Sequence, residues 1–144
     1  MKEMEAKRAI YGTRSEVWLD GDKIAEAKAC KATLTADKVE VKMAMHQSKG
    51  YKQVGYTGKG SIKLHKLSSY FIKKIAPSIK EGKQCEFTII SKLADPDAYG
   101  VERVALYKVQ FDSVDLINWE VGKLGEESYN FTFEDYDMLD EIDV

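Results

Sequence analysis

The stretch that decides the fold is Phe87-Thr-Ile-Ile-Ser-Lys-Leu-Ala-Asp-Pro-Asp-Ala-Tyr-Gly-Val-Glu-Arg-Val-Ala-Leu106. Two runs of β-favouring residues flank segment 95–100, in which Pro96 fixes φ, the aspartates can bond nearby backbone N–H groups and Gly100 accepts a positive φ. The stretch carries no nucleophile beside a base, no ligand cluster and no phosphate-binding loop. It therefore predicts an antiparallel hairpin, and it favours a chain that builds a structure over an enzyme.

Most of the remaining sequence also has the pattern of strands. Asp20-Gly21 is a turn pair that predicts a second hairpin, between residues 16–20 and 23–26. Residues 38–45 alternate strictly, with Val39, Val41, Met43 and Met45 on one face, which predicts a half-buried strand. Further strands are expected at 23–36, 61–65, 85–93, 102–111, 114–121 and 128–133.

One helix is expected, at about residues 66–80. From Lys66 onward the apolar residues recur at spacings of three and four, as Leu67, Tyr70, Phe71, Ile75 and Ile79. Ser68 or Ser69 suits the start of this helix, Pro77 should break or kink its last turn, and Gly82 suits its end.

Two segments show neither the alternation of a strand nor the three-to-four-residue spacing of a helix. Residues 46–60 contain four glycines and several polar residues, which predicts a mobile loop. The acidic C-terminal segment 134–144 holds six carboxylates and no base. The whole chain has a net charge of −2, so the rest of the chain has a net charge of +4.

A length of 144 residues allows one core, so we expect a single domain over residues 1–144. The predicted fold is mainly β, an antiparallel sandwich or barrel with one helix.

The composition also bears on partners and location. Arginine is scarce among the bases, with Arg8, Arg14 and Arg103 the only three, which argues against sequence-specific reading of DNA. The charged start and the lack of any apolar run approaching ~18 residues predict no signal peptide and no membrane anchor, hence synthesis in the cytoplasm. Cys30 and Cys85 lack CxxC spacing and are expected to be reduced, small core residues.

No constellation predicts a catalytic, metal or cofactor site. Asp95-x-Asp97-x-x-Gly100 opens like an EF-hand loop, but Leu106 stands where a bidentate Glu is required. The glycines at 55, 58 and 60 precede a strand rather than a helix, so they lack a phosphate-binding helix end.

Two further sets of side chains carry groups that can bind zinc or act as acids and bases. His46, His65 and the two cysteines have no zinc-ligand spacing. Glu126 and Glu127 are expected to face water, without a neighbour that would separate their pKa values for acid–base work.

The acidic segment 134–144 has two possible interpretations. Its charges alternate with Tyr136, Met138, Leu139 and Ile142. It is either a solvated, fraying terminus or a segment that docks against the same or a neighbouring subunit through these apolar side chains.

Several motifs in order resemble one known family. They are Glu16-Val-Trp-Leu-Asp-Gly-Asp-Lys23, Gly55-Tyr-x-Gly-Lys-Gly-Ser61, the hairpin from Phe87 to Leu106, Asn118-Trp-Glu-Val-Gly122 and Phe131-Thr-Phe-x-Asp-Tyr-Asp137. The chain resembles the tail tube proteins of contractile-tailed phages, PBSX-like prophages and R-type bacteriocins such as diffocin.

The resemblance implies a structural protein. It implies self-assembly into hexameric rings stacked as an inner tube, a conduit for DNA that passes without specific binding, or for ions in a bacteriocin. It also implies a sheath protein, a baseplate or hub, a tape-measure protein and a tail terminator as partners. The expected location is the host bacterial cytoplasm during assembly and then the tail of a virion or bacteriocin particle.

Candidate assembly residues lie in the two segments without a regular period. They are Lys49, Tyr51, Tyr56 and Lys59 in residues 46–60, and Tyr136, Leu139 and Ile142 in the acidic segment. The alternative function is a monomeric β-barrel that binds a nucleic-acid strand or a small ligand. That alternative would use Tyr129, Phe131 and Phe133 as a stacking surface, yet Glu134 and Asp135 beside them would repel phosphate, and a core role for the three rings is favoured.

Overall fold

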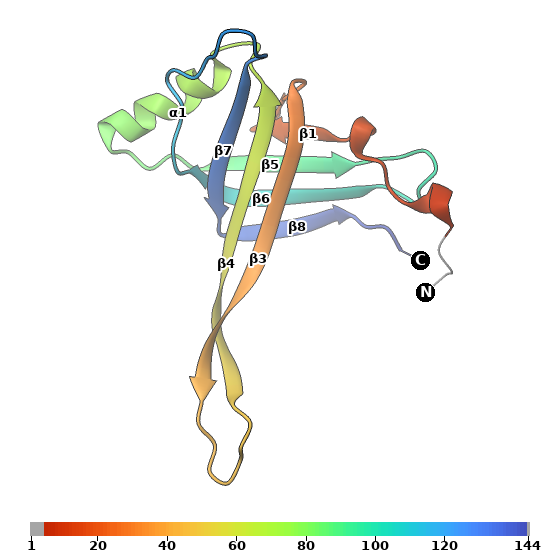
Figure 1. Cartoon of the computed structure of the whole chain (residues 1–144), viewed down its shortest axis with the longest axis vertical. Helices are drawn as coiled ribbons and strands as arrows, with labels where there is room; N and C mark the ends of the chain where they lie inside the picture. The colour runs from red at the N-terminus through yellow and green to blue at the C-terminus, as the bar shows by residue number, and fades with distance from the viewer. Residues whose placement is uncertain (1–4, 144) are drawn as a thin grey trace.

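A computed structural model describes residues 5–143 and shows a mainly antiparallel β protein with one helix, as predicted (Figure 1). The strands are β1 (Glu16–Leu19), β2 (Asp22–Lys23), β3 (Ala27–Val41), β4 (Gly50–His65), β5 (Phe87–Leu93), β6 (Glu102–Phe111), β7 (Glu126–Phe133) and β8 (Asp135–Asp140). The helix is α1 (Tyr70–Glu81), and two short 3-10 turns, Ala6–Arg8 and Gly12–Arg14, precede β1.

The strands follow the order β2-β1-β5-β6-β7-β4-β3, and β8 pairs with β6 outside this path. Strand β6 joins two layers, because its first part pairs with β5 and β8 while Gln110 and Phe111 pair with β7. In Figure 1 the layer of β5, β6 and β8 crosses the layer of β3, β4 and β7, with α1 beside the upper end of the second layer.

Both predicted hairpins are present. Asp20 and Gly21 have φ values of 49° and 87°, the left-handed geometry of a two-residue turn between β1 and β2. Between β5 and β6 the backbone N–H of Ala98 donates to the Asp95 carbonyl oxygen at 3.0 Å. The N–H groups of Asp97 and Tyr11 donate to the Asp95 carboxylate and lower its pKa.

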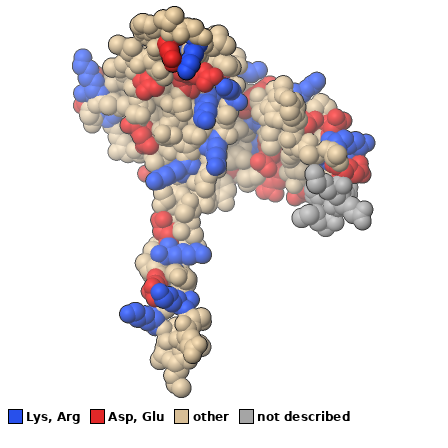
Figure 2. All heavy atoms as spheres, viewed as in Figure 1, with Lys and Arg blue, Asp and Glu red and all other residues tan. Residues whose placement is uncertain are grey.

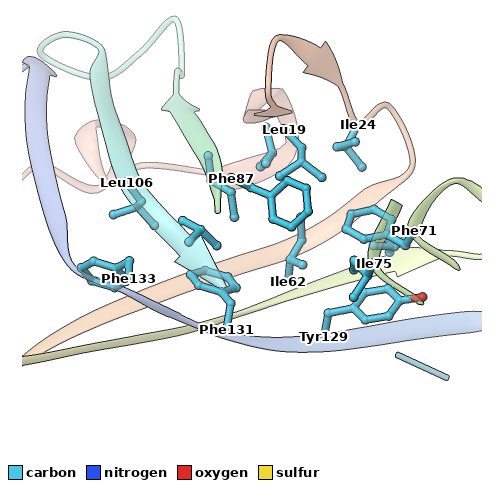
Figure 3. Packing of buried hydrophobic residues seen from close by; sticks show 14 residues of the cluster. Leu19, Ile24, Ile62, Phe71, Ile75, Phe87, Leu106, Tyr129, Phe131 and Phe133 are labelled. Atoms are coloured by element: carbon cyan, nitrogen blue, oxygen red, sulfur yellow. The ribbon is translucent and has the colours of Figure 1, made fainter. Parts of the chain in front are cut away.

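The core lies between the two layers and α1 (Figure 3). Tyr129, Phe131 and Phe133 of β7 are all buried, so their predicted core role is confirmed. Phe71 of α1 stacks on Tyr129 with ring centroids 4.7 Å apart, which fixes the helix against the sheet. Burying large aromatic side chains of this kind removes about 150–250 Å² of surface each, so these rings carry much of the stability.

The predicted loop at 46–60 is wrong for residues 50–60, which belong to β4 and pair with β3 along their length. Two of the glycines in this segment are explained by close packing against β7 and do not mark a loop. Gly58 and Gly60 lie opposite Phe133 and Phe131 of β7, and an added Cβ would come within 2.6 Å and 2.5 Å of those rings. The connection between β3 and β4 is therefore residues 42–49, and its mobility stays a prediction.

The helix and one predicted strand also differ from expectation. Helix α1 begins at Tyr70 and continues through Pro77 to Glu81, so the expected break at Pro77 is not found, and a kink there stays a prediction. Gly82, with φ of 71°, ends the helix as expected. Residues 114–121 are not a strand, since the chain leaves the sheet after Phe111 and runs past α1 before it returns as β7.

Candidate assembly surface

The most prominent feature of the molecule is a two-stranded ribbon that projects from the body (Figure 1). Strand β7 covers β4 only from Gly58 to His65, so beyond Gly58 the strands β3 and β4 pair only with each other. We call residues 35–57 the arm. The pairing register shifts between Asp37 and Lys38, which leaves Val54 of β4 without an opposite residue.

Large apolar side chains are exposed along the arm. They are Val39, Val41, Met43, Met45, Tyr51, Val54 and Tyr56, with exposed fractions from 40% to 104%. The half-buried strand predicted for residues 38–45 ends at Val41, and Met43 and Met45 lie in the connection beyond it. Among the described residues the apolar side chains of this segment stay exposed, so the expected half-burial is not found.

The four candidates in 46–60 have different surroundings. Lys49 lies 3.9 Å from the Glu40 carboxylate, and Tyr51 is exposed. The Tyr56 hydroxyl donates to the Glu134 carbonyl oxygen at 3.0 Å, which ties the base of the arm to the start of β8. Lys59 lies just inside the body, where β4 has partners on both sides.

The acidic segment forms β8 along the edge of β6, so a fraying terminus is wrong for residues 135–140. Docking occurs within the subunit through backbone pairing and through an ion pair of 2.9 Å between Arg103 and Asp140. Tyr136 and Leu139 remain exposed, while Ile142 is half-buried beside Gly100. The structure therefore joins the two candidate groups only where Tyr56 meets Glu134.

Sequence reasoning missed a second exposed apolar surface, on the connection between β6 and β7. We call residues 112–125 the apical loop, because it lies at the end of the body opposite the arm (Figure 1). Its exposed apolar side chains are Leu116, Ile117, Trp119, Val121 and Leu124, with exposed fractions from 66% to 88%. The strand predicted for residues 114–121 is wrong, since none of the described strands pairs with this segment.

An apolar groove of about 710 Å³ continues this surface onto the helix. Ile72, Ala76 and Pro77 of α1 line one wall, and Val114 and Leu116 of the apical loop line the other. The apical loop and the groove together form one continuous apolar region.

A partly buried ion pair lies just beyond the C-terminal end of the apical loop. Glu127 is only 4% exposed and pairs with Lys66, so the expectation that it faces water is wrong. The pKa of Tyr129 beside it is raised, first by burial and then by the negative charge of Glu127. Glu126 is exposed as predicted, and its hydrogen bond with Lys28 at 2.7 Å lowers its pKa.

Other site chemistry is limited in the part of the chain that the structure describes. Within residues 5–143 no group of three His, Cys, Asp or Glu residues could hold a metal ion. None of the helical residues described forms a segment long and apolar enough to cross a membrane. Both cysteines are free, and burial raises the pKa of Cys30 to about 11, whereas Cys85 is exposed and is not the core residue expected.

This antiparallel fold exposes large apolar side chains at both ends, which is typical of a protein that associates with other chains. A family model described as "Phage tail tube protein" matches residues 2–140, and the chain belongs to this family. The family is structural, which confirms both the sequence resemblance and the expectation of a non-enzymatic protein.

Comparison with individual proteins agrees with the family. The phage-like element PBSX protein XkdM of Bacillus subtilis is 32% identical over 141 residues, which cover 96% of each chain. A solved structure of a Bacillus subtilis protein is 31% identical, covers 94% of this chain and 99% of its own, and has a TM-score of 0.55.

The same fold occurs in more distant particles. A chain in the sheath–tube complex of the PVC extracellular contractile injection system matches with a TM-score of 0.72 at 9% identity, covering 92% of this chain and 93% of that chain. This likeness confirms the tail-tube-like fold.

Proposed function

We propose that this chain assembles into hexameric rings that stack as the inner tube of a contractile phage-like tail. The observation that carries the proposal is the arm. An isolated two-stranded ribbon is marginally stable in water, and this ribbon also exposes seven large apolar side chains. Contacts with other copies would cover those side chains and stabilise the ribbon.

Open sheet edges support association around a ring. Strands β2 and β3 end the sheet order on its two sides, and β8 pairs only with β6. An unpaired edge is a template for another strand, and closure of copies into a ring removes such edges. Tyr136 and Leu139 lie exposed on β8, which supports the proposal that they contact a neighbour at such an edge.

The remaining partners follow from the proposed particle. The fold neighbours include chains from a PVC sheath–tube complex, an anti-feeding prophage cap and an anti-feeding prophage baseplate. By analogy we propose a sheath protein, a terminator and a baseplate or hub as partners here, with a tape-measure protein inside the tube. DNA, or ions in a bacteriocin, would pass through the lumen without specific binding.

The test removes the arm and leaves the body intact. Asp37 and Gly55 face each other across β3 and β4, so residues 38–54 can be replaced by Asn-Gly as a two-residue turn. The parent chain is expected to form tubes with six-fold end views in negative-stain images. The shortened chain should keep its far-UV circular dichroism and remain a small species in sedimentation velocity.

Two results would contradict the proposal. One is a parent chain that stays monomeric at all concentrations and salt conditions tried. The other is a shortened chain that forms normal tubes, which would show that the arm is dispensable for assembly.

A further inference from the structure

We infer that strand β8 and the arm are coupled through a junction at Glu134, so that the pairing of β8 with β6 sets the direction in which the arm projects. The coupling is a property of the single subunit and goes beyond the proposed function. The junction joins Tyr56 at the base of the arm, Glu134 between β7 and β8, and the corner of β6 at residues 107–108.

The first argument is that the arm has few contacts that fix its direction. Figure 2 shows the arm standing clear of the body below the point where the two meet. Within residues 5–143, Tyr56 is the one residue of the arm whose side chain makes a hydrogen bond or an ion pair with a residue outside it. Its hydroxyl donates to the carbonyl oxygen of Glu134 at 3.0 Å, so this bond opposes a swing of the arm about its base.

The second argument is that Glu134 is itself held by β6. Its backbone N–H donates to the carbonyl oxygen of Tyr107 at 3.2 Å, and its carboxylate lies 3.6 Å from the ammonium group of Lys108. The N–H and the C=O of one residue therefore connect β6 to the arm. A shift of Glu134 along β6 moves the acceptor of the Tyr56 bond with it.

The corner of β6 is a strained and specific piece of backbone. Lys108 has φ of 54°, a left-handed conformation that residues other than glycine rarely adopt. The pairing register with β5 shifts at the same place, where Tyr107 and Lys108 together stand opposite Thr88, so the strand has a β-bulge there. Such strain persists only where surrounding contacts over-determine the conformation, and the two contacts with Glu134 are among them.

Strand β8 completes the junction, because it starts at the residue that follows Glu134. Asp135 pairs with Tyr107, and the ion pair between Arg103 and Asp140 holds the other end of β8 on β6. Among the described strands β8 pairs only with β6, so its outer edge is open. If β8 leaves β6, Glu134 is no longer held, and the arm loses its fixed acceptor.

The coupling has a consequence for assembly, and this part alone rests on the proposed function. A neighbouring copy that pairs with the open edge of β8 would hold β8 on β6. It would thereby also hold the direction of the arm. Closure of a ring and alignment of its arms would then be linked events.

The test measures how far the arm swings in single subunits, in solutions that sedimentation shows to be monomeric. Ser48→Cys places one spin label near the tip of the arm, the exposed Cys85 takes the second, and Cys30→Ala removes the other thiol. Pulsed electron spin resonance then gives the distribution of distances between the labels. In this background Tyr56→Phe removes the hydroxyl at the junction, and Tyr51→Phe is the matched control on the same strand.

The Tyr56→Phe variant should increase the population of displaced arms roughly two- to tenfold, the factor that corresponds to one hydrogen bond. Tyr51→Phe should leave the distribution unchanged. Deletion of residues 136–144 should displace the arm as Tyr56→Phe does, and the two changes together should add nothing further, since they act on one junction. If circular dichroism shows that the shortened chain does not fold, Arg103→Gln with Asp140→Asn loosens β8 in its place.

Three results would overturn the inference. They are a Tyr56→Phe distribution equal to that of the parent, a loosened β8 that leaves the arm undisturbed, and effects of the two changes that add in full. Each would show that the arm takes its direction from β3 and β4 alone or that the bond acts independently of β8. A chain that forms no tubes would contradict the proposed function and leave the coupling in the single subunit standing.

Discussion

Replacement of Gly60 by alanine tests the packing that places β4 under the aromatic rings of β7. An added Cβ at this position would lie 2.5 Å from Phe131 Cζ and 2.6 Å from the Lys31 carbonyl oxygen. Real Cβ atoms do not approach heavy atoms this closely, and the backbone oxygen cannot move as a side chain can. Overpacking of this kind typically costs about 1–3 kcal/mol of the free energy of unfolding.

Gly55→Ala is the matched control, because Gly55 lies on the same strand and its added Cβ would meet nothing closer than 3.8 Å. Both variants remove the entropy of glycine from the unfolded chain, a gain of about 0.4–1 kcal/mol. The difference between them therefore isolates the contact at Gly60.

We expect Gly60→Ala to melt roughly 3–9 °C below Gly55→Ala, since ~1 kcal/mol corresponds to about 3 °C for a chain of this length. The assay is thermal and urea unfolding followed by circular dichroism, at a concentration at which sedimentation shows monomers. Equal midpoints for the two variants would refute the close approach of β4 to Phe131.

Three further predictions concern the turn, the terminus and the thiols. Gly21→Val should lower the free energy of unfolding by about 1–3 kcal/mol because φ is 87° there, while Gly21→Asn should cost less, as urea titration would show. Deletion of residues 136–144 should reduce stability and impair tube formation, because it removes most of β8 from the edge of β6; normal tubes by negative stain would contradict this. Cys85 should react with iodoacetamide at pH 8 many times faster than Cys30, whose pKa is about 11, and peptide mass spectrometry over time would detect equal rates if the burial were wrong.

The parts of the fold that were predicted correctly are those specified by nearby residues. The Asp20-Gly21 turn is set by backbone preference, and the 95–100 turn by the hydrogen bonds of Asp95, without the positive φ expected at Gly100. The aromatic alternation of β7 placed its rings in the core because a period of two assigns every second side chain to one face. Local chemistry was sufficient in each case.

The errors arose where a distant segment decides the outcome. Gly58 and Gly60 indicate a loop when considered alone, and only their pairing with Phe133 and Phe131 shows that they are strand residues. Glu127 resembled a surface carboxylate until Lys66, from the strand–helix junction, was placed beside it. Such contacts are separated by roughly sixty residues or more in sequence.

The assembly surface was predicted only in part for a related reason. Alternation in residues 38–45 correctly indicated a strand as far as Val41, but a single sequence does not say whether the same chain or another copy covers its apolar side chains. Residues 114–121 of the apical loop were predicted to be a strand, which concealed their exposure. The signal that could have located this surface is the density of large apolar residues between Leu116 and Leu124.

The arm leaves the body at one end only, and this gives any stack of copies in a common orientation a direction. One terminus of the stack displays free arms and the other displays bare apical loops, so the two termini are chemically different. If proteins start and cap such a filament, they meet different surfaces, because one of them faces free arms and the other faces apical loops. If copies add one at a time, an incoming copy likewise meets a different surface at each terminus.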